Sequence, residues 1–447
     1  MNIDLTKGNI IKGILLFALP IYIGQLFSML YGVIDTRIVG SVLGEASLAS
    51  VSASAPLSEL IIEFENGVSC GFGIILAMLI GAGSKEKLKK NIATSFWMIV
   101  VLSVLISFIC ILFINPILRF LNVEAEIIDD AREYITIILI GIVFLAIYNL
   151  IVAILRSMGD SVTPLVFLIV SNIMNIILDV TFVKILNLGV SGAAWATAIT
   201  QIVCCVGCFI YFVYSKKELK LKLEDFIFER EIVVTLFKNG MSMGCMLSFV
   251  LLGSLVLQTA INGLGTDIIV AHTAARRITI LCLIPFFSMG AAMSTFCGQN
   301  KGAQKPDRIR KGVINSIFIS ACWWLISTVI VFIFSSKMIT AITASNSEVI
   351  IANAVNYLRI NSVLFILPAI ICILRNSLQG LGDTRTPLIS SLIELFGKVI
   401  ITYTLVASLE YFGVIIAEPI VWSMMVIPLI IKWRKCNCIA YWLWFGQ

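Results

Sequence analysis

Long runs of apolar residues, separated by short polar breaks, make up most of this chain. The runs from Trp97 to Ile117 and from Ile314 to Phe334 contain no charged residue. A helix of about 20 apolar residues is long enough to cross the hydrocarbon core of a bilayer. The pattern therefore predicts membrane-spanning α-helices.

Breaks that contain Gly, Pro and charged residues divide the chain into twelve such segments. We expect spans at residues 12–42, 46–80, 93–115, 127–155, 163–185, 190–214, 233–263, 267–299, 311–334, 349–373, 386–408 and 412–433. The predicted fold class is an all-α polytopic membrane protein with twelve transmembrane helices.

Composition excludes the soluble classes. The chain has 447 residues, of which 59% are hydrophobic and 13% are charged, whereas soluble proteins carry about 25% charged residues. The formal net charge is +6, but membrane proteins collect Lys and Arg in cytoplasmic loops. We therefore expect the lipid bilayer, and no nucleic acid, as a partner.

The basic residues fall in alternate loops. The main clusters are Lys85 to Lys90, Lys216 to Arg230, Lys301 to Lys311, and Lys432 to Lys435, with Lys7, Lys12, Arg156, Arg375 and Arg385 at the same side. The intervening loops are poor in base. The positive-inside rule then predicts a multi-pass protein of the plasma membrane, of bacterial inner-membrane type, with both termini cytoplasmic.

The chain also repeats itself. Gly81-Ala82 resembles Gly302-Ala303, and the turn that starts at Gly159-Asp160 resembles the turn that starts at Gly382-Asp383, in each case roughly 220 residues apart. Repeats with an even number of spans are related by a pseudo-twofold axis along the membrane normal. We expect an N-terminal six-helix lobe at 1–214, a cytoplasmic linker at 215–232, a C-terminal six-helix lobe at 233–434 and a cytoplasmic tail at 435–447.

Several motifs resemble those of the multidrug and toxic compound extrusion (MATE) family. They are Leu19-Pro20, Asp35-Thr36-Arg37-Ile38-Val39-Gly40, Gly81-Ala82-Gly83, Asn175-Ile176-Ile177-Leu178-Asp179, Gly192-Ala193-Ala194-Trp195-Ala196-Thr197, and the two Gly-Asp-Ser/Thr-x-Thr-Pro turns. The resemblance implies two lobes around a central cavity and a secondary active antiporter. It would export drugs, toxins or organic cations and metabolites by alternating access, driven by Na⁺ or H⁺.

Polar residues recur at helical spacing within three spans. The sets are Gln25, Ser28, Gly32 and Asp35; Asn172, Asn175 and Asp179; and Thr197, Thr200, Gln201 and Cys204. Carboxylate, amide and hydroxyl oxygens suit a hard cation, and two neighbouring carboxyls could instead hold a proton.

The resemblance implies a cation-coupling site at Asp35, Asn175, Asp179 and Thr197. It implies no cofactor besides Na⁺ or H⁺, and we expect a monomer. The alternative is that these side chains only tie helices together by hydrogen bonds.

We expect a substrate cavity at Gln25, Ser28, Glu59, Glu63, Asn172 and Gln258. Glu59 and Glu63 lie one turn apart and would attract a cationic substrate, although they could instead pair with structural charges such as Arg37. In the second half, Val256 matches Asp35 and the tenth span carries Arg359, so coupling is expected in the N-terminal lobe.

The other intramembrane charges have simpler explanations. Glu394 and Lys398 have the spacing of an intrahelical ion pair. His272, the one histidine of the chain, is expected to be structural rather than a proton relay.

Two other functions stay open. A lipid-linked saccharide flippase would need Arg or Lys inside the spans to hold pyrophosphate, whereas the interior charges of the first half are acidic. A membrane enzyme or channel would need a catalytic or pore motif, and no HExxH, GxSxG or Walker sequence is present.

Overall fold

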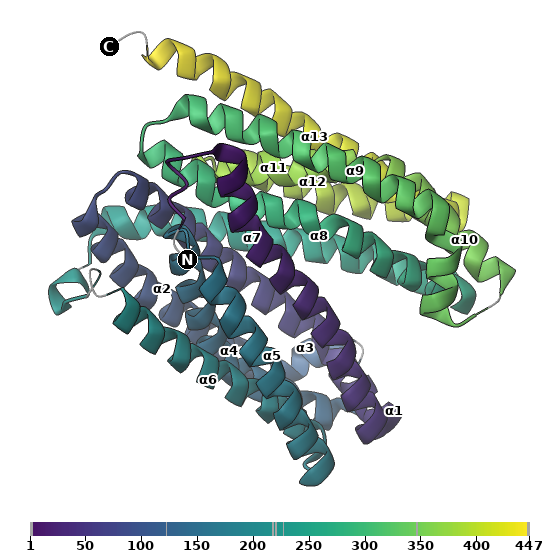
Figure 1. Ribbon diagram of the computed structural model, residues 1–447. Coiled ribbons are helices and arrows are strands. Elements are labelled where there is room, and N and C mark those ends of the chain that lie inside the picture. Colours follow the sequence, from purple (N-terminus) through teal and green to yellow (C-terminus); the bar gives the residue numbers. More distant parts are fainter. Residues whose placement is uncertain are drawn as a thin grey trace. The chain divides into compact units, whose positions relative to one another are not determined.

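The computed structural model describes residues 3–121, 123–216, 219, 221–226, 228–345 and 347–444, without the side chains of 35–48, 223 and 437–444. Every regular element within these residues is helical (Figure 1). The all-α membrane fold expected from the apolar runs is confirmed.

The elements follow one another with short connections. They are α1 (Ile10–Gly81), α2 (Lys85–Leu112), α3 (Ile114–Phe120), α4 (Ile128–Ser157), α5 (Val162–Asp179), η1 (Val180–Ile185), α6 (Gly189–Ser215), η3 (Leu223–Phe226), α7 (Arg230–Asn262), α8 (Thr266–Gly302), α9 (Pro306–Thr343), α10 (Glu348–Val363), α11 (Ile366–Gly380), α12 (Arg385–Ile401), η4 (Thr402–Val406) and α13 (Ala407–Trp444).

The described helices account for twelve spans. Ten helical stretches are long and apolar enough to cross a membrane, and α10 with α11 forms one further span that is bent by 52°. The stretch Arg385–Cys436 counts once among the ten. It divides in two at Glu410, where the backbone leaves the helical region (φ 51°, ψ −129°).

The bend between α10 and α11 lies inside the span expected at 349–373. Pro368 is the third residue of α11 and has no backbone N–H to donate to Leu364, whose carbonyl instead accepts a 2.9 Å hydrogen bond from the N–H of Leu367. Pro368 is therefore compatible with a break in the helix at this point. Apolar periodicity alone does not reveal the break.

Internal contacts divide the chain into two compact units. Unit 1 is built on Ile23–Gly244, and unit 2 on Asp4–Tyr22 and the chain from Cys245 onward. The boundaries of the lobes expected from sequence stay a prediction. The two halves share one detail, because α5 and α12 each continue into a π-helical segment, η1 and η4.

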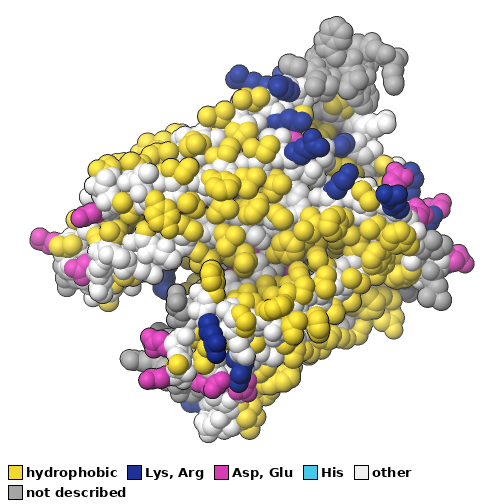
Figure 2. All heavy atoms as spheres, turned by 180° about the vertical axis from the view of Figure 1, so that it is seen from behind, with side chains coloured by type: hydrophobic (Ala, Val, Ile, Leu, Met, Phe, Trp, Pro, Cys, Tyr) yellow, Lys and Arg dark blue, Asp and Glu magenta, His cyan; other side chains and the backbone are white. Residues whose placement is uncertain are grey.

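One helix is central in each unit. In α4 of unit 1 and in α8 of unit 2, 61% of the membrane window is buried, against 17% in α5 and in α9. The peripheral helices turn apolar side chains such as Phe318 outward, as lipid-facing helices do. Figure 2 shows that hydrophobic side chains cover much of one face.

Within unit 1, α1 packs closely against the first part of α7. A Cβ atom on Gly67 would lie 2.6 Å from the carbonyl oxygen of Met243, and one on Gly71 would lie 2.5 Å from that of Asn239. Gly240 and Gly244 receive Phe72 and Phe64 in return. Small residues allow such backbone approach in membranes.

Candidate functional site

Asn175 of α5 is the centre of a polar cluster in unit 1. Tyr31 of α1 shares a short hydrogen bond with its amide. With the amide turned so that both ends are satisfied, Nδ2 donates to Asp179 Oδ2 at 2.8 Å and Oδ1 accepts from the N–H of Thr197 at 3.3 Å. In the other orientation Nδ2 lies 3.5 Å from Thr197 Oγ1. The amide thus joins α1, α5 and α6.

The sequence of α5 explains why this face lies inside the unit. Asn172, Asn175 and Asp179 follow at three- and four-residue spacing and are all buried, with Asp179 only 1% exposed. Ile173 and Ile177 point away, and Ile177 is 59% exposed. Asp179 is also the last residue before the π-helical η1, a distortion that often accompanies functional sites.

Three of the four residues expected at a cation site therefore lie together. These are Asn175, Asp179 and Thr197. The side chain of Asp35 lies outside the described residues. Sequence reasoning missed Tyr31, although a signal existed, because Tyr31 is three residues after Ser28 and four before Asp35 on the same helical face.

The donor set of this cluster is made of oxygen. It combines the Asp179 carboxylate, the amide oxygen of Asn175 and the hydroxyls of Thr197 and Tyr31. Thr197 Oγ1 also lies 3.2 Å from the carbonyl oxygen of Ala193 and donates to it. Such a set fits a hard monovalent cation, or a proton on the carboxylate.

The residues expected to line a substrate cavity are more scattered. In unit 1, Gln25, Ser28 and Glu63 are partly buried, Glu59 is exposed, and Asn172 is buried. Gln258 belongs to unit 2, where its side chain donates a 2.9 Å hydrogen bond to Asn262 of the same helix. Their shared role stays a prediction.

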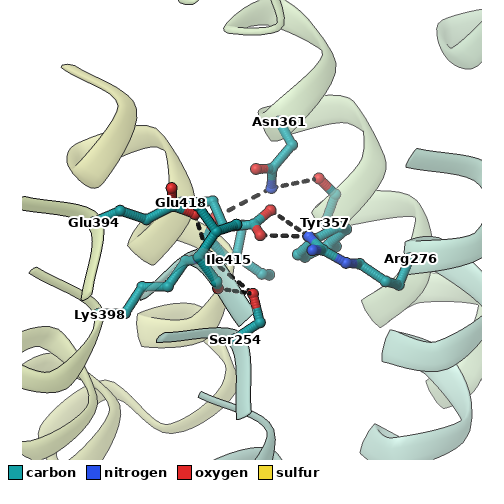
Figure 3. Close-up of polar contacts among 9 residues, drawn as sticks. Ser254, Arg276, Tyr357, Asn361, Glu394, Lys398, Ile415 and Glu418 are labelled. Carbon is teal, nitrogen blue, oxygen red and sulfur yellow. Dashed lines mark hydrogen bonds and ion pairs between the residues drawn. The ribbon is translucent and has the colours of Figure 1, made fainter. Parts of the chain in front are cut away.

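Unit 2 contains a buried ionic network that sequence reasoning missed. Arg276 of α8 donates to Glu418 Oε1 of α13, and the hydroxyl of Tyr357 of α10 donates to Glu418 Oε2 at 2.9 Å (Figure 3). The Glu418 side chain is 5% exposed and that of Arg276 is 34% exposed. The sequence signal was a lone Glu in the apolar run of the last span.

A second ion pair lies on α12, near this network. Lys398 Nζ donates to Glu394 Oε1 at 2.9 Å and to Ser254 Oγ of α7 at 3.1 Å (Figure 3). This confirms the expected intrahelical ion pair. His272 packs edge-on against Tyr357, with ring centroids 5.1 Å apart, and its structural role stays a prediction.

Comparisons with known proteins agree on one family. The family model MatE matches residues 20–181 and 243–404. The chain is 24% identical over 426 residues to the probable multidrug resistance protein YoeA of Bacillus subtilis, covering 93% of this chain and 91% of that one. It is 24% identical over 422 residues to the multidrug export protein MepA of Staphylococcus saprophyticus, covering 94% and 91%.

Solved structures show the same fold. The crystal structure of MATE in complex with MaL6 has a TM-score of 0.88 at 24% identity and covers 98% of both chains. The outward-facing conformation of a multidrug resistance MATE family transporter of the MOP superfamily has a TM-score of 0.87 at 25% identity, again covering 98% of both.

Proposed function

This chain belongs to the MATE family of multidrug efflux transporters, and on that premise we propose that it is an antiporter that exchanges drugs, toxins or organic cations for Na⁺ or H⁺. The observation that carries the proposal is the buried cluster of Asn175, Asp179, Thr197 and Tyr31. A carboxylate kept inside a membrane protein usually serves a transport or relay step.

Asp179 is the residue we assign to cation exchange. In a site of low dielectric constant its carboxylate is stable only when a cation, a proton or hydrogen bonds offset its charge. The Asn175 amide donates to this carboxylate and so orients it. A cation that enters would be met by the oxygens of Thr197 and Tyr31, and Asp35 would supply the second carboxylate of the site.

Coupling is assigned to the first repeat because each buried glutamate of unit 2, among its described residues, is ion-paired with a basic side chain. When the two sequence repeats are aligned, Thr402 corresponds to Asp179 and Val256 corresponds to Asp35. The buried acids of unit 2, Glu394 and Glu418, are held by Lys398 and Arg276. Each thus has a permanent counter-charge and no need of an exchangeable cation.

The same pairing argues against the flippase alternative. Arg276 and Lys398 are basic groups inside spans, as an anionic pyrophosphate would require, but each is already neutralised by a glutamate. In unit 1, Glu59 and Glu63 would instead attract a cationic substrate. An exporter of small cationic or amphiphilic compounds is therefore the better match.

The placement in the cell follows from the basic loops. We propose a protein of a bacterial plasma membrane with both termini in the cytoplasm, because Lys and Arg collect in alternate loops. We also propose that the single chain works as a monomer.

The test is efflux of a fluorescent organic cation from proteoliposomes under separately imposed sodium and proton gradients. We expect efflux with at least one gradient and none without either. Equal efflux in the absence of both gradients, or none under any gradient, would overturn the antiport mechanism.

A further inference from the structure

Five acidic side chains are buried among the described residues: Glu65, Asp160, Asp179, Glu394 and Glu418. Four of them have partners. Asp160 accepts from Thr163 at 2.9 Å, Asp179 from Asn175, Glu394 from Lys398, and Glu418 from Arg276 and Tyr357. Glu65 of α1 is 1% exposed, and neither of its carboxyl oxygens has a hydrogen-bond partner that satisfies ordinary geometry.

Two hydroxyl groups accompany this carboxyl. Ser103 of α2 lies beside it, and Ser69 is one helical turn further along α1. Both serines are fully buried, and apart from the approach of Ser103 to the Glu65 carboxyl, neither hydroxyl has a hydrogen-bond partner. Three buried oxygen-bearing groups, all with unused hydrogen-bonding capacity, thus lie at one place in unit 1.

The helices around this place bring no charge to it. One turn before Glu65, Ile61 belongs to a hydrophobic core cluster with α4 and α6, and Val68, three residues after Glu65, belongs to another. The charges of α2 lie at Lys85 to Lys90, roughly 20 Å along the helix from Ser103. The helix α6 (Gly189–Ser215) has no Asp, Glu, Lys or Arg.

The charges of the remaining neighbours lie at helix ends or on other faces. Those of α4 are Asp129, Asp130, Arg132, Glu133 and Arg156, and those of α7 are Arg230, Glu231 and Lys238, near its start. Arg156 of α4 and Glu63 of α1 both interact electrostatically with Cys70 of α1. Glu63 and Cys70 lie on a different face of α1 from Glu65 and Ser69. Glu59, earlier on α1, is exposed.

An ionised carboxylate without a counter-charge is strongly disfavoured in such surroundings. The protonated acid is neutral, and its hydroxyl could donate to a serine oxygen while its carbonyl accepts from the other serine. We propose that Glu65 is a second proton-binding residue of unit 1, neutral in the present conformation, which releases its proton to water when the surrounding helices open during transport.

The transport role given to Glu65 rests on the proposed antiport function, whereas the protonation of its carboxyl does not. The step is a proton transfer alone: the O–H bond of the Glu65 carboxyl breaks, water takes the proton, and the carboxylate remains until it is reprotonated. It adds a proton site separate from the Asn175 and Asp179 cluster of α5.

Infrared spectroscopy of the purified protein in lipid tests the chemistry without any substrate. At pH 7 exposed carboxyls are ionised, so a protonated-carboxyl C=O band that disappears in Glu65→Gln would identify Glu65. We expect that band in choline and in sodium buffers, and we expect it to shift in D₂O as the site opens to water. No band lost in Glu65→Gln, a band that vanishes in sodium, or one that never shifts in D₂O would each overturn the proposal.

Transport provides the matched functional test. Glu65→Gln imitates the neutral acid, so it should fold normally but lose at least tenfold in proton-driven efflux, whereas Glu133→Gln, an exposed acid at the start of α4, should behave like the wild type. Ser103→Ala removes one hydrogen-bond partner and should shift the pH profile of efflux. Wild-type efflux and an unchanged pH profile in both variants would refute proton release. Absence of efflux in the wild type would refute the antiport function and would leave the infrared result to decide on Glu65.

Discussion

At the scale of single residues, Asp179 is the side chain on which the proposed exchange depends. Asp179→Asn preserves size and polarity but can neither carry a negative charge nor bind and release a proton. We expect gradient-driven efflux to fall at least about tenfold, the equivalent of 1.4 kcal/mol, with normal expression. The measurement is the initial efflux rate in proteoliposomes, beside Glu133→Gln as control.

Asp35→Asn should have the same effect, and the double variant should be little worse than either single one, since residues of one site are not additive. Full efflux by a well-folded Asp179→Asn protein would remove the cluster on α5 from the mechanism and leave Glu59, Glu63 and Glu65 as candidates.

Glu418 makes a different kind of prediction, about stability. Glu418→Gln leaves the Arg276 guanidinium without its counter-charge, and breaking a buried pair typically costs about 3 to 5 kcal/mol. We expect the lower end of that range, because the Arg276 side chain is 34% exposed. Thermal unfolding in detergent measures it.

The double variant Glu418→Gln with Arg276→Met should recover most of the loss, since no unpaired charge then remains. If Glu418→Gln unfolds at the wild-type temperature, the pair does not hold α8 and α13 together.

The residue patterns show what sequence could and could not predict. The shared face of Asn175 and Asp179 was predictable, because the two residues are four positions apart in one helix. Thr197 was expected through the family resemblance. Arg276 and Glu418 are 142 residues apart, and nothing local says that they meet. The burial of Glu65 was equally invisible, because Glu59, Glu63 and Glu65 differ only in the helical face that they occupy.

At the scale of elements, the contact between α1 and α7 depends on glycine. Gly71→Ala would place a methyl group 2.5 Å from the carbonyl oxygen of Asn239, so the two backbones would have to separate. We expect a loss of about 1 to 3 kcal/mol, as for other overpacked sites, seen as a lower unfolding temperature.

Gly32→Ala is the matched control on the same helix, because a Cβ there meets nothing within 4 Å beyond its chain neighbours and the backbone of its own helical turn. Its better helix propensity is worth up to about 1 kcal/mol, so its unfolding temperature should stay equal or rise. The reverse order of the two variants would show that this close approach does not limit stability.

The turn between α11 and α12 predicts that the stability of the fold depends on pH. Burial opposes ionisation of Asp383, but hydrogen bonds from the hydroxyl and N–H of Thr386 and from the N–H of Arg385, with the nearby Lys432, outweigh it and lower the pKa of Asp383. A carboxyl with a lowered folded-state pKa stabilises the fold above its unfolded pKa of about 3.9, and the contribution disappears as the pH falls through the folded-state pKa.

Asp383→Asn should therefore unfold at a lower temperature than the wild type at pH 7, by the equivalent of about 1 kcal/mol. The difference should shrink as the pH falls below about 4. Scanning fluorimetry across that range measures it, and a difference that stays constant with pH would exclude the charge of Asp383 as its cause.

Elements were predicted better in number than in shape. Apolar length was enough for the spans, because the bilayer fixes the length of a helix that crosses it. It could not reveal η1 and η4, nor the break before Pro368, since these depend on which backbone hydrogen bonds the tertiary structure satisfies.

At the scale of the whole molecule, the two halves share turns and π-helical segments but not their charges. The first half keeps Asp179 before η1, where the second half has Thr402 in η4. The second half instead pairs its buried acids with Arg276 and Lys398. We therefore expect the exchangeable charge of the proposed mechanism in the first half, whereas the buried glutamates of the second half form fixed charge pairs.

The orientation of the whole chain gives the last prediction. The first turns of α2 carry Lys85, Lys87, Lys89 and Lys90, whereas the segment before α4 carries Glu124 and Glu126 and no base after Arg119. Because translocated loops are poor in Lys and Arg, Lys87 should face the cytoplasm and Glu126 the outside.

In a variant without native cysteines, Glu126→Cys should react with a membrane-impermeant maleimide in intact cells, and Lys87→Cys only after the cells are opened. Both positions are exposed, so failure to react would not come from burial. Labelling of Lys87→Cys from outside would show that the topology is the reverse of the predicted one. The gradients proposed to drive export would then drive transport through unit 1 in the opposite direction.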